Sequence, residues 1–431
     1  MNGGLSMAEM KSGYKMTDIG VIPEDWEVKE FNETFSVIPN NSLSRDYLNT
    51  QAGEYHDIHY GDVLIKYGAL LDAGNTEIPF INKAITDKWV NRRIVTEGDI
   101  IMADTAEDNT VGKCSEVINV NHKKIVSGLH TFWLHPNEGL FEKGFLGYFM
   151  NHSLYHNQLL PLIHGTKVSS VSKNEILGTR VLVPLKNEQT AIATALSDVD
   201  SLISALTKKI EKKKAIKQGI MQQLLTGKKR LPGFNDKWKS MLLGDIAEVK
   251  DGTHQTPKYV KSGGKPFYSV ENVTADDFKN VKHISLEEHK ALTSNCRIEK
   301  GDVLMTRIGS IGCCKYVDWD VDASFYVSLA LLKINEKYDS KFISYLSNIK
   351  SFKEEVMLNS LVFAIPQKIN LGNISLIKVY IPTSKAEQTA ISNILSDCDS
   401  EIAALEEKRD KYKEIKQGMM QQLLTGKIRL I

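Results

Sequence analysis

The feature that most constrains this chain is an internal repeat. Residues 188–231 align without a gap on residues 387–430, and 30 of the 44 aligned positions are identical. Both copies begin with E-Q-T-A-I, contain L-S-D-x-D-S, and end with I-K-Q-G-x-M-Q-Q-L-L-T-G-K-x-R-L. Chance does not produce such identity, so the chain contains a duplication and both copies must adopt the same local structure.

Each copy predicts one long helix with a narrow apolar stripe. The stripe consists of Ile192, Leu196, Val199, Ile203, Leu206 and Ile210 in the first copy, and of Ile391, Leu395, Cys398, Ile402 and Leu405 in the second. The alternating steps of four and three residues are typical of a coiled-coil seam. We therefore expect the two helices to pack on each other. In the alternative, each helix covers only its own globular domain.

The segment before each helix predicts a domain of mixed character, and the two segments correspond loosely. Trp26 matches Trp238, and G-D-I-I-M at residues 98–102 matches G-D-V-L-M at residues 301–305. Short β-rich runs separated by Gly, Asn and Asp lie between these landmarks. The expected fold class is α+β: two mixed α/β domains separated by two long helices that form an antiparallel coiled coil, with a pseudo-two-fold internal repeat.

The expected boundaries follow from the repeat. They are a disordered N-terminal extension over residues 1–16, a first domain over 17–185, a helix over 186–230, a second domain over 231–383 and a C-terminal helix over 384–431. An antiparallel pairing returns the C-terminus to the start of the first domain, near Val21. Gly219 and Gly418 interrupt the two helices at equivalent positions, which indicates a kink or the close approach of another backbone.

Composition excludes several classes of protein. No run approaches 18 uninterrupted apolar residues, which excludes a membrane-spanning helix, and the N-terminus lacks a secretory signal. Five cysteines without a C-x-x-C pair argue against a zinc site and against an extracellular disulfide framework. We expect a soluble, cytoplasmic protein. Its 54 basic and 53 acidic residues leave a net charge of +1, which neither favours nor excludes nucleic acid.

Catalytic motifs are missing from the sequence. No two prolines are adjacent, so the N-P-P-Y or D-P-P-Y signature of adenine methyltransferases is absent, and no Walker A phosphate loop occurs. The histidines form no H-x-x-x-H or H-E-x-x-H pattern, so metal chemistry has no support. The sequence predicts a chain that is not catalytic alone and carries no cofactor or metal.

Nucleic-acid binding has moderate support. Residues 206–230 contain nine Lys or Arg and one acid, Glu211, and such a segment can neutralise phosphates. A solvated flank of the coiled coil explains the same run. A Gly-rich loop with Arg307 follows the second G-D strand, and Arg pairs with guanine; a surface β-turn is the alternative. The candidate DNA-binding residues are Lys66, Tyr67, Asp104, Asn109 and Lys113 in the first domain, and His254, Lys258, Tyr259, Arg307 and Ser310 in the second.

Taken together, these motifs resemble the specificity subunit of type I DNA restriction–modification systems. The resemblance rests on I-P-E-D-W near the start, the two G-D-[IV]-[IL]-M strands and the repeated E-Q-T-A-I…Q-Q-L-L-T-G-K helix, and it extends from about residue 11 to residue 431. It implies two target-recognition domains, each of which reads one half of a split, asymmetric target in double-stranded DNA.

The resemblance also implies partners. Two methyltransferase subunits would dock on the helices, which also set the spacing, and restriction/translocase subunits would join them. S-adenosylmethionine, ATP and Mg²⁺ would belong to those partner chains. We expect helix faces outside the mutual seam to provide the docking residues Lys213, Lys217, Met221, Lys416 and Met420. The competing hypotheses are a coiled-coil adaptor whose end domains bind ligands other than DNA, and a self-contained restriction-methylation enzyme.

Overall fold

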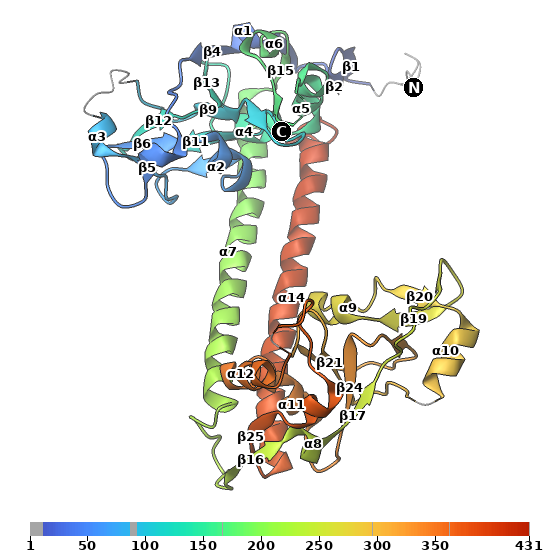
Figure 1. The fold of residues 1–431 in the computed structure, drawn as a ribbon. Coiled ribbons are helices and arrows are strands. Elements are labelled where there is room, and N and C mark those ends of the chain that lie inside the picture. Colours follow the sequence, from blue (N-terminus) through green and yellow to red (C-terminus); the bar gives the residue numbers. More distant parts are fainter. Residues whose placement is uncertain (1–11, 87–92, 166, 295, 362, 431) are drawn as a thin grey trace. The chain divides into compact units, whose positions relative to one another are not determined.

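The computed structural model describes residues 12–86, 93–165, 167–294, 296–361 and 363–430 (Figure 1). The chain divides into two compact units, which are described separately. Unit 1 is Met1–Thr207 with Glu407–Ile431, and unit 2 is Lys208–Glu406. Each unit therefore combines one mixed domain with a part of both long helices.

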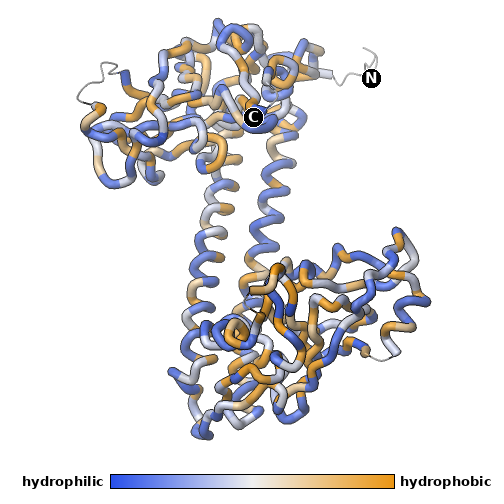
Figure 2. The backbone as a smooth tube through the Cα atoms, in the orientation of Figure 1, coloured by the Kyte–Doolittle hydropathy of each residue, from blue (hydrophilic) through white to orange (hydrophobic). Residues whose placement is uncertain are grey.

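The long helices are α7 (Lys186–Leu224) and α14 (Lys385–Leu423), of 39 residues each. Figure 2 shows that hydrophobic residues gather in the mixed domains, whereas the two helices are largely hydrophilic with hydrophobic residues recurring along them. The predicted stripe is the buried or half-buried side of both helices. The spacing of the apolar residues therefore identified the correct helix face.

Unit 1 contains the elements of the first domain. Its strands are β1 (Tyr14–Thr17), β2 (Gly20–Pro23), β3 (Glu27–Glu30), β4 (Phe35–Ile38), β5 (Leu48–Asn49), β6 (Tyr55–Ile58), β7 (Leu70–Asp72), β8 (Phe80–Ile81), β9 (Ile100–Ala103), β10 (Thr105–Ala106), β11 (Cys114–Ile118), β12 (Lys124–Ser127), β13 (Thr131–Pro136), β14 (Ser169–Ser170) and β15 (Arg180–Val183). Its short helices are α1 (Phe31–Thr34), α2 (Tyr60–Ile65), α3 (Lys83–Thr86), α4 (Phe145–Met150), α5 (Ser153–Leu159) and α6 (Lys173–Ile176), with 3-10 turns η2 (Arg45–Tyr47) and η3 (Leu160–Leu162).

Unit 2 follows the same plan. Its strands are β16 (Trp238–Leu242), β17 (Ala247–Asp251), β18 (Tyr259–Val260), β19 (Lys265–Tyr268), β20 (Lys282–Ile284), β21 (Val303–Thr306), β22 (Cys314–Tyr316), β23 (Ser324–Phe325), β24 (Leu329–Ile334) and β25 (Lys378–Pro382). Its short helices are α8 (Leu243–Ile246), α9 (Val270–Ala275), α10 (Leu286–Thr293), α11 (Ser340–Leu346), α12 (Lys350–Leu358) and α13 (Leu371–Ser375).

The sheets show that the two domains are copies. The order β4-β13-β9-β11-β7 in unit 1 corresponds to β17-β24-β21-β22 in unit 2. Parallel β6 and β12 correspond to parallel β19 and β23, and the pair β3 and β15 corresponds to β16 and β25. The strands β9 and β21 arise from the two G-D sequences and are fully buried, because apolar side chains cover both of their faces.

The helices pack antiparallel within each unit. In unit 1, Lys416 near the end of α14 forms an ion pair with Asp200 of α7, at 2.7 Å. In unit 2, Lys213 of α7 forms an ion pair with Glu401 of α14, also at 2.7 Å. The core of each unit accordingly includes the first turns of one long helix and the last turns of the other. The predicted fold class, with an antiparallel helix pair and a repeated domain, is confirmed.

The predicted N-terminal extension needs a correction. Residues 1–11 lie outside the described residues, but the end of the extension is part of the fold. Tyr14 begins β1, which pairs with β2, and its hydroxyl donates a 2.8 Å hydrogen bond to the carbonyl oxygen of Gly426. The prediction of disorder through residue 16 was wrong there, because composition does not reveal a short hairpin that the distant C-terminal tail holds in place.

Candidate nucleic-acid interface

The two units hold the residue that follows the G-D strand in the same backbone frame. In unit 1, the Asp104 amide donates to the His130 carbonyl at 3.1 Å, and the Val171 amide donates to the Asp104 carbonyl at 3.0 Å. In unit 2, the Arg307 amide donates to the Ser328 carbonyl, and the Ile369 amide donates to the Arg307 carbonyl, both at 2.9 Å. Asp104 and Arg307 therefore occupy one structural position with opposite charges.

In unit 1 this position opens into a polar cleft of about 410 Å³, lined by Asn40, Asn41, Ser42, Leu43, Asp104, Leu129 and His130. His130 Nδ1 lies 3.3 Å from Asp104 Oδ1, which also accepts a 2.6 Å hydrogen bond from the Thr105 hydroxyl. Carboxylate and amide groups are among the side chains that read base edges, since a carboxylate accepts from cytosine and an amide pairs with adenine.

A buried carboxyl holds one side of this cleft in place. Asp57 is fully buried, and the Asn41 amide donates to its Oδ2 at 2.7 Å and to the Ser127 carbonyl at 2.9 Å. Burial raises the pKa of Asp57 to about 7, because the charged form loses its hydration. Asn41 is thus positioned from behind, which leaves Asn40 and His130 to present polar groups at the surface.

The side chain of Arg307 is not exposed, as direct contact with DNA bases would require. Only 7% of Arg307 is exposed. Its Nε donates to the Val327 carbonyl at 2.8 Å, and its guanidinium lies 3.4 Å from the Asp251 carboxylate. This placement does not support the predicted DNA contact of Arg307, because the loop after β21 turns the side chain back toward β17. The Arg307 guanidinium connects the loop after β21 to the residues Asp251 and Val327, with which it interacts.

The other candidates in unit 2 are at the surface. Lys258 and Ser310 are exposed, and Tyr259 is 47% exposed beneath the Lys282 ammonium, which lies 5.1 Å from its ring centre. His254 is exposed, and its Nε2 lies 2.7 Å from Asp251 Oδ2. The Asp251 carboxylate therefore connects His254 to the buried Arg307, so that the loop between β17 and β18 and the loop after β21 form one surface.

The candidates in unit 1 divide into buried and exposed groups. Tyr67 is 3% exposed and lies in the core, and the Lys113 ammonium donates to the Leu64 carbonyl at 2.5 Å. The Lys66 ammonium donates to the Glu77 carbonyl at 2.5 Å. The burial of Tyr67 leaves its side chain no surface for a DNA contact, whereas a DNA contact of Lys66 or Lys113 stays a prediction. Asn109 is exposed.

The predicted docking residues of the helices lie on the packed side. Lys213 and Lys217 continue the stripe and form ion pairs with Glu401 and Asp399, and Met221 is 3% exposed in the core of unit 2. Lys416 forms its ion pair with Asp200, and Met420 packs against the core of unit 1. The prediction that these side chains avoid the seam was wrong, because the stripe extends past its last apolar residue by means of lysine stems.

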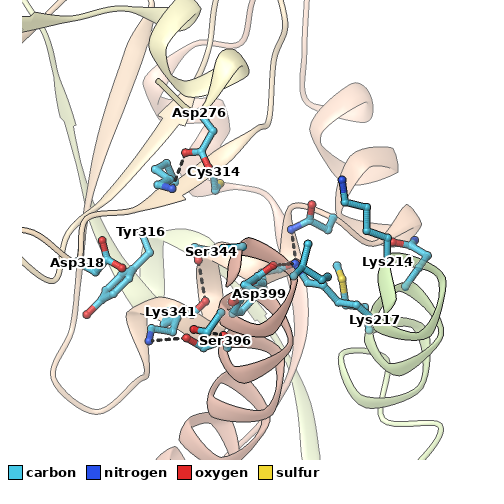
Figure 3. A pocket seen from close by; sticks show the side chains of 18 of the residues that line it. Lys214, Lys217, Asp276, Cys314, Tyr316, Asp318, Lys341, Ser344, Ser396 and Asp399 are labelled. Atoms are coloured by element: carbon cyan, nitrogen blue, oxygen red, sulfur yellow. Dashed lines mark hydrogen bonds and ion pairs between the residues drawn. The ribbon is translucent and has the colours of Figure 1, made fainter. Parts of the chain in front are cut away.

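A cavity of about 720 Å³ lies in unit 2 between the helices and the domain (Figure 3). Three ion pairs line it: Lys217 with Asp399, Lys315 with Asp276 at 2.5 Å, and Lys214 with Glu406 at 2.7 Å. The Tyr345 hydroxyl also donates to Asp399, at 2.7 Å. Tyr148, Asp200 and Lys416 repeat that arrangement in unit 1. The cavity is therefore part of a polar joint that holds helix to domain.

Sequence reasoning missed a buried ion-pair cluster between helix and domain. In unit 1, Glu188 is buried, accepts a 2.8 Å hydrogen bond from Trp26 Nε1 and binds Arg429 through two contacts of 2.6 and 2.8 Å. Arg429 also lies over the Trp26 ring, and its ion pairs with Glu188 and Asp25 raise its pKa. The identical Glu of E-Q-T-A-I and Arg of T-G-K-x-R-L were the available signal.

Unit 2 repeats the same three-residue cluster. Glu387 is fully buried, binds Arg230 through contacts of 2.6 and 2.7 Å, and accepts a 3.4 Å hydrogen bond from Trp238 Nε1. The neighbouring Gln388 amide donates to the Pro382 carbonyl and its oxygen accepts from the Asp339 amide. We call the three-residue clusters the anchors. They explain why E-Q and K-x-R-L recur.

Among the described residues, no group of three or more His, Cys, Asp or Glu side chains lies close enough to hold a metal ion. Over the same parts of the chain, no helix has the length and apolar content needed to cross a bilayer.

Comparison with known families matches nearly all of the chain. The type I restriction modification DNA specificity domain matches twice, over residues 23–218 and 235–417. A relative, the type I restriction enzyme MjaVIII specificity subunit of Methanocaldococcus jannaschii, is 24% identical and the match covers 95% of this chain and 94% of that protein.

Solved structures show the same fold. The S subunit of a type I restriction–modification system from M. genitalium superposes with a TM-score of 0.59 at 16% identity, covering 92% of this chain and 96% of that one. A chain from a structure that addresses complex assembly and conformational transition of the type I R-M system gives a TM-score of 0.52 at 16% identity, covering 94% and 99%.

Proposed function

Because the chain belongs to the type I restriction modification DNA specificity family, we propose that each of its two domains reads one half of a split, asymmetric DNA target. As a specificity subunit the chain is not the catalytic component of such a system. The main support for recognition in two parts is that equivalent backbone hydrogen bonds hold Asp104 in one unit and Arg307 in the other. Equivalent surfaces of different chemistry suit different half-sites.

The cleft of unit 1 and the loops around Asp251 in unit 2 are the proposed reading surfaces. Asn40, Asp104 and His130 would contact base edges in the first half-site. His254, Lys258 and Ser310 would contact bases or phosphates in the second, where Arg307 holds the loops from behind. Phosphate contacts position the protein, whereas base contacts select the sequence.

Methylome sequencing tests this proposal. Cells that carry the complete system with and without this gene are compared, and the methylated sequence should require the gene and consist of two separated parts. Asp104→Asn and His130→Ala should relax only the part read by unit 1, and His254→Ala only the other. Ser36→Ala, which alters an exposed hydroxyl beside Asn137, is the control. A single undivided target, or variants that change both parts together, contradict the proposal.

The helices are proposed to set the spacing of the two half-sites and to dock the methyltransferase subunits. Support comes from residues that are identical in both copies of the repeat although no contact within the chain explains them. Ile216 and the equivalent Ile415 are 45% and 41% exposed. A Cβ at Gly219 or Gly418 would meet no heavy atom within 4 Å, yet both positions are Gly inside continuous helices. Glycine there costs about 1 kcal/mol relative to Ala, which fits close approach by a partner.

Co-purification with the methyltransferase tests the docking surface. Ile216→Asp and Gly219→Arg should weaken the complex, and Ile415→Asp and Gly418→Arg should do the same at the second copy. Glu211→Arg, at an exposed position of the same helix, is the matched control. Complexes of normal stability with all four substitutions combined contradict the proposal.

S-adenosylmethionine, ATP and Mg²⁺ are proposed to act on partner subunits, including a restriction/translocase chain. Equilibrium binding of S-adenosylmethionine should be found in the complex with methyltransferase and should be absent from this chain alone. A site on the isolated chain contradicts this division of roles. The cytoplasm is the proposed location, since the DNA target lies there.

A further inference from the structure

Each unit carries a small hairpin beside its reading loop. Finger 1 is residues 163–170 and finger 2 is residues 361–368, described apart from positions 166 and 362. In finger 1, the His164 and Ser170 amides and carbonyls bond to each other at 2.9 and 2.8 Å. In finger 2, the Leu361 amide donates to the Lys368 carbonyl at 2.8 Å. The two hairpins thus occur at the same place in both copies.

The fingers are tied to the loops that follow β9 and β21. Strand β14 of finger 1 pairs with β10, where Thr105 lies opposite Ser170. In finger 2, Lys368 bridges to Ile308, and the Gly309 amide donates to the Gln367 carbonyl at 2.8 Å. A surface that reads DNA through these loops therefore brings the fingers to the duplex as well.

The tip of finger 2 has an unusual composition for a surface. Phe363 and Ile365 are both 99% exposed, and Ala364 and Pro366 complete the tip. Monomeric proteins leave single apolar residues in water without consequence, but two large ones at the end of a narrow projection mark a binding element. In finger 1 the apolar tip residue is Val168, which is 52% exposed.

The charges around the tip favour a polyanion over a protein groove. Residues 356–370 contain no Asp or Glu, and residues 158–172 contain none either, in a chain that has 53 acidic residues. Each finger contributes one exposed cation, Lys167 and Lys368. A hairpin that has no carboxylate of its own and carries one exposed lysine can approach phosphates with little repulsion.

On these grounds, and resting on the proposed function, we propose that the tip of finger 2 is a wedge that inserts Phe363 and Ile365 against the bases of the duplex. Proteins that bend DNA insert such residues, Phe, Ile and Pro among them, between base steps and partly unstack them. The resulting specificity comes from how easily a base step deforms, since apolar side chains make no hydrogen bonds to base edges. Finger 1, with the smaller Val168, would press on its half-site without unstacking it.

The test uses the complex of this chain with its methyltransferase subunits and a duplex that contains the target found by methylome sequencing. The probe is 2-aminopurine, placed in turn at each position of the half-site read by unit 2 except the methylated adenine, which the methyltransferase itself extrudes. We expect wild-type complex to raise the fluorescence at one base step. With Phe363→Ser and Ile365→Ser combined, that increase should disappear and DNA affinity should fall about tenfold or more, as for loss of a stacked aromatic.

Leu358→Ser is the matched control, because Leu358 is 78% exposed on α12 outside the finger, and it should change neither signal. The substituted tip side chains make no buried contacts, so the melting temperature should stay the same. Wild-type binding with no fluorescence increase, or a double variant of unchanged affinity, overturns the wedge alone. Loss of methyltransferase co-purification assigns the tip to protein and also overturns it. A wild-type complex that ignores the target overturns the proposed function and the wedge together.

Discussion

The two units agree where helix meets domain and differ where the loops meet solvent. Both anchors use a Trp, a buried Glu and an Arg with nearly the same distances, 2.6 Å between Arg Nε and the Glu carboxylate in each. The position after the G-D strand, in contrast, is Asp104 in unit 1 and Arg307 in unit 2. The anchors are alike because loss of a partner leaves a buried carboxylate unpaired, which is strongly destabilising. The surface loops can differ because their residues are constrained by the ligand that each loop binds.

The anchors also exchange their arginines between the repeats. Arg429, from the second repeat, closes unit 1, and Arg230, from the first repeat, closes unit 2. Each unit is therefore completed by the tail of the other copy's helix. Substitution of the arginine in one repeat should then weaken the unit that contains the glutamate of the other repeat, which gives the comparison a direct test.

The largest expected effect is loss of an anchor glutamate. Glu188→Ala should destabilise unit 1, and Glu387→Ala unit 2, each by about 3–5 kcal/mol, because removal of the buried carboxylate leaves an indole N–H unpaired and the arginine without its buried partner. Of its ion pairs, Arg429 then keeps only the exposed one with Asp25. Hydrogen exchange resolved by peptide measures the two units separately. Arg429→Ala should likewise loosen unit 1 and spare unit 2.

Glu211→Ala is the control, at an exposed position of α7, and should change neither unit. Strongly unequal losses for Glu188 and Glu387, or destabilisation of unit 2 by Arg429→Ala, contradict the equivalence of the two anchors.

The sequence was sufficient to predict this architecture. Identity over the repeat predicted two equal helices, and the stripe from Ile192 to Ile210 predicted their buried face. Antiparallel pairing was expected with them, and the ion pairs within each unit show it. These predictions succeeded because long helices depend on periodicity, which a sequence displays directly.

The candidate site was less predictable. Lys213 and Lys217 looked like solvated lysines, and only the opposing carboxylates of α14 show that they line the seam. Arg307 begins a glycine-rich segment typical of an exposed loop, but its guanidinium lies inward against Asp251, 56 positions earlier. Contacts between residues far apart in the sequence decide such cases, and no local pattern contains them.

The next effect in size concerns pH and should distinguish the units. Glu116 of β11 is buried and accepts hydrogen bonds from the Gly144 and Gly147 amides at 2.5 and 2.8 Å, and burial raises its pKa to about 7. At the equivalent register, unit 2 has Tyr316. The folded state thus keeps a proton that the unfolded chain loses above about pH 4.5, so stability is fully present below that pH and is lost as the pH rises through 7.

We expect Glu116 to cost unit 1 about 3 kcal/mol between pH 4.5 and pH 7, with Asp57 adding to it. Hydrogen exchange at pH 5 and pH 8, corrected for the intrinsic rates, should show unit 1 weakening relative to unit 2. Glu116→Gln should reduce this pH dependence. Equal behaviour of the two units, or a stability of unit 1 that rises with pH, would count against the assignment.

A smaller effect is expected from Arg307. Arg307→Ala should destabilise unit 2 by about 2 kcal/mol, because the Val327 carbonyl and the Asp251 carboxylate lose a buried donor. Asp104→Ala, at the equivalent position of unit 1, should cost less than about 0.5 kcal/mol, since Asp104 is half-buried and bonds to Thr105 and His130 near solvent. Denaturant unfolding followed by hydrogen exchange compares them, with Ser310→Ala as control. A larger loss for Asp104 than for Arg307 reverses the assignment.

The smallest expected effect comes from moving the peptide link between helix tail and domain from unit 2 to unit 1. In unit 2 the tail T-G-K-K-R-L continues directly into Trp238, whereas in unit 1 the tail T-G-K-I-R-L is held without a chain link, by Arg429 against Asp25 at 2.8 Å and by Gly426 against Tyr14. A circular permutant that starts at Pro232 and joins Ile431 to Ser12 through a short Gly-Ser linker moves the link from one unit to the other. Because one loop closure replaces another, stability should change by less than about 1 kcal/mol, and the methylated sequence should stay the same.

A permutant with Arg429→Ala, in which the linker alone holds the tail, should lose the stability of unit 1 despite the covalent link. A permutant that folds but directs methylation to a different sequence would show that the link in unit 2, and not the anchor, determines how the domain is held.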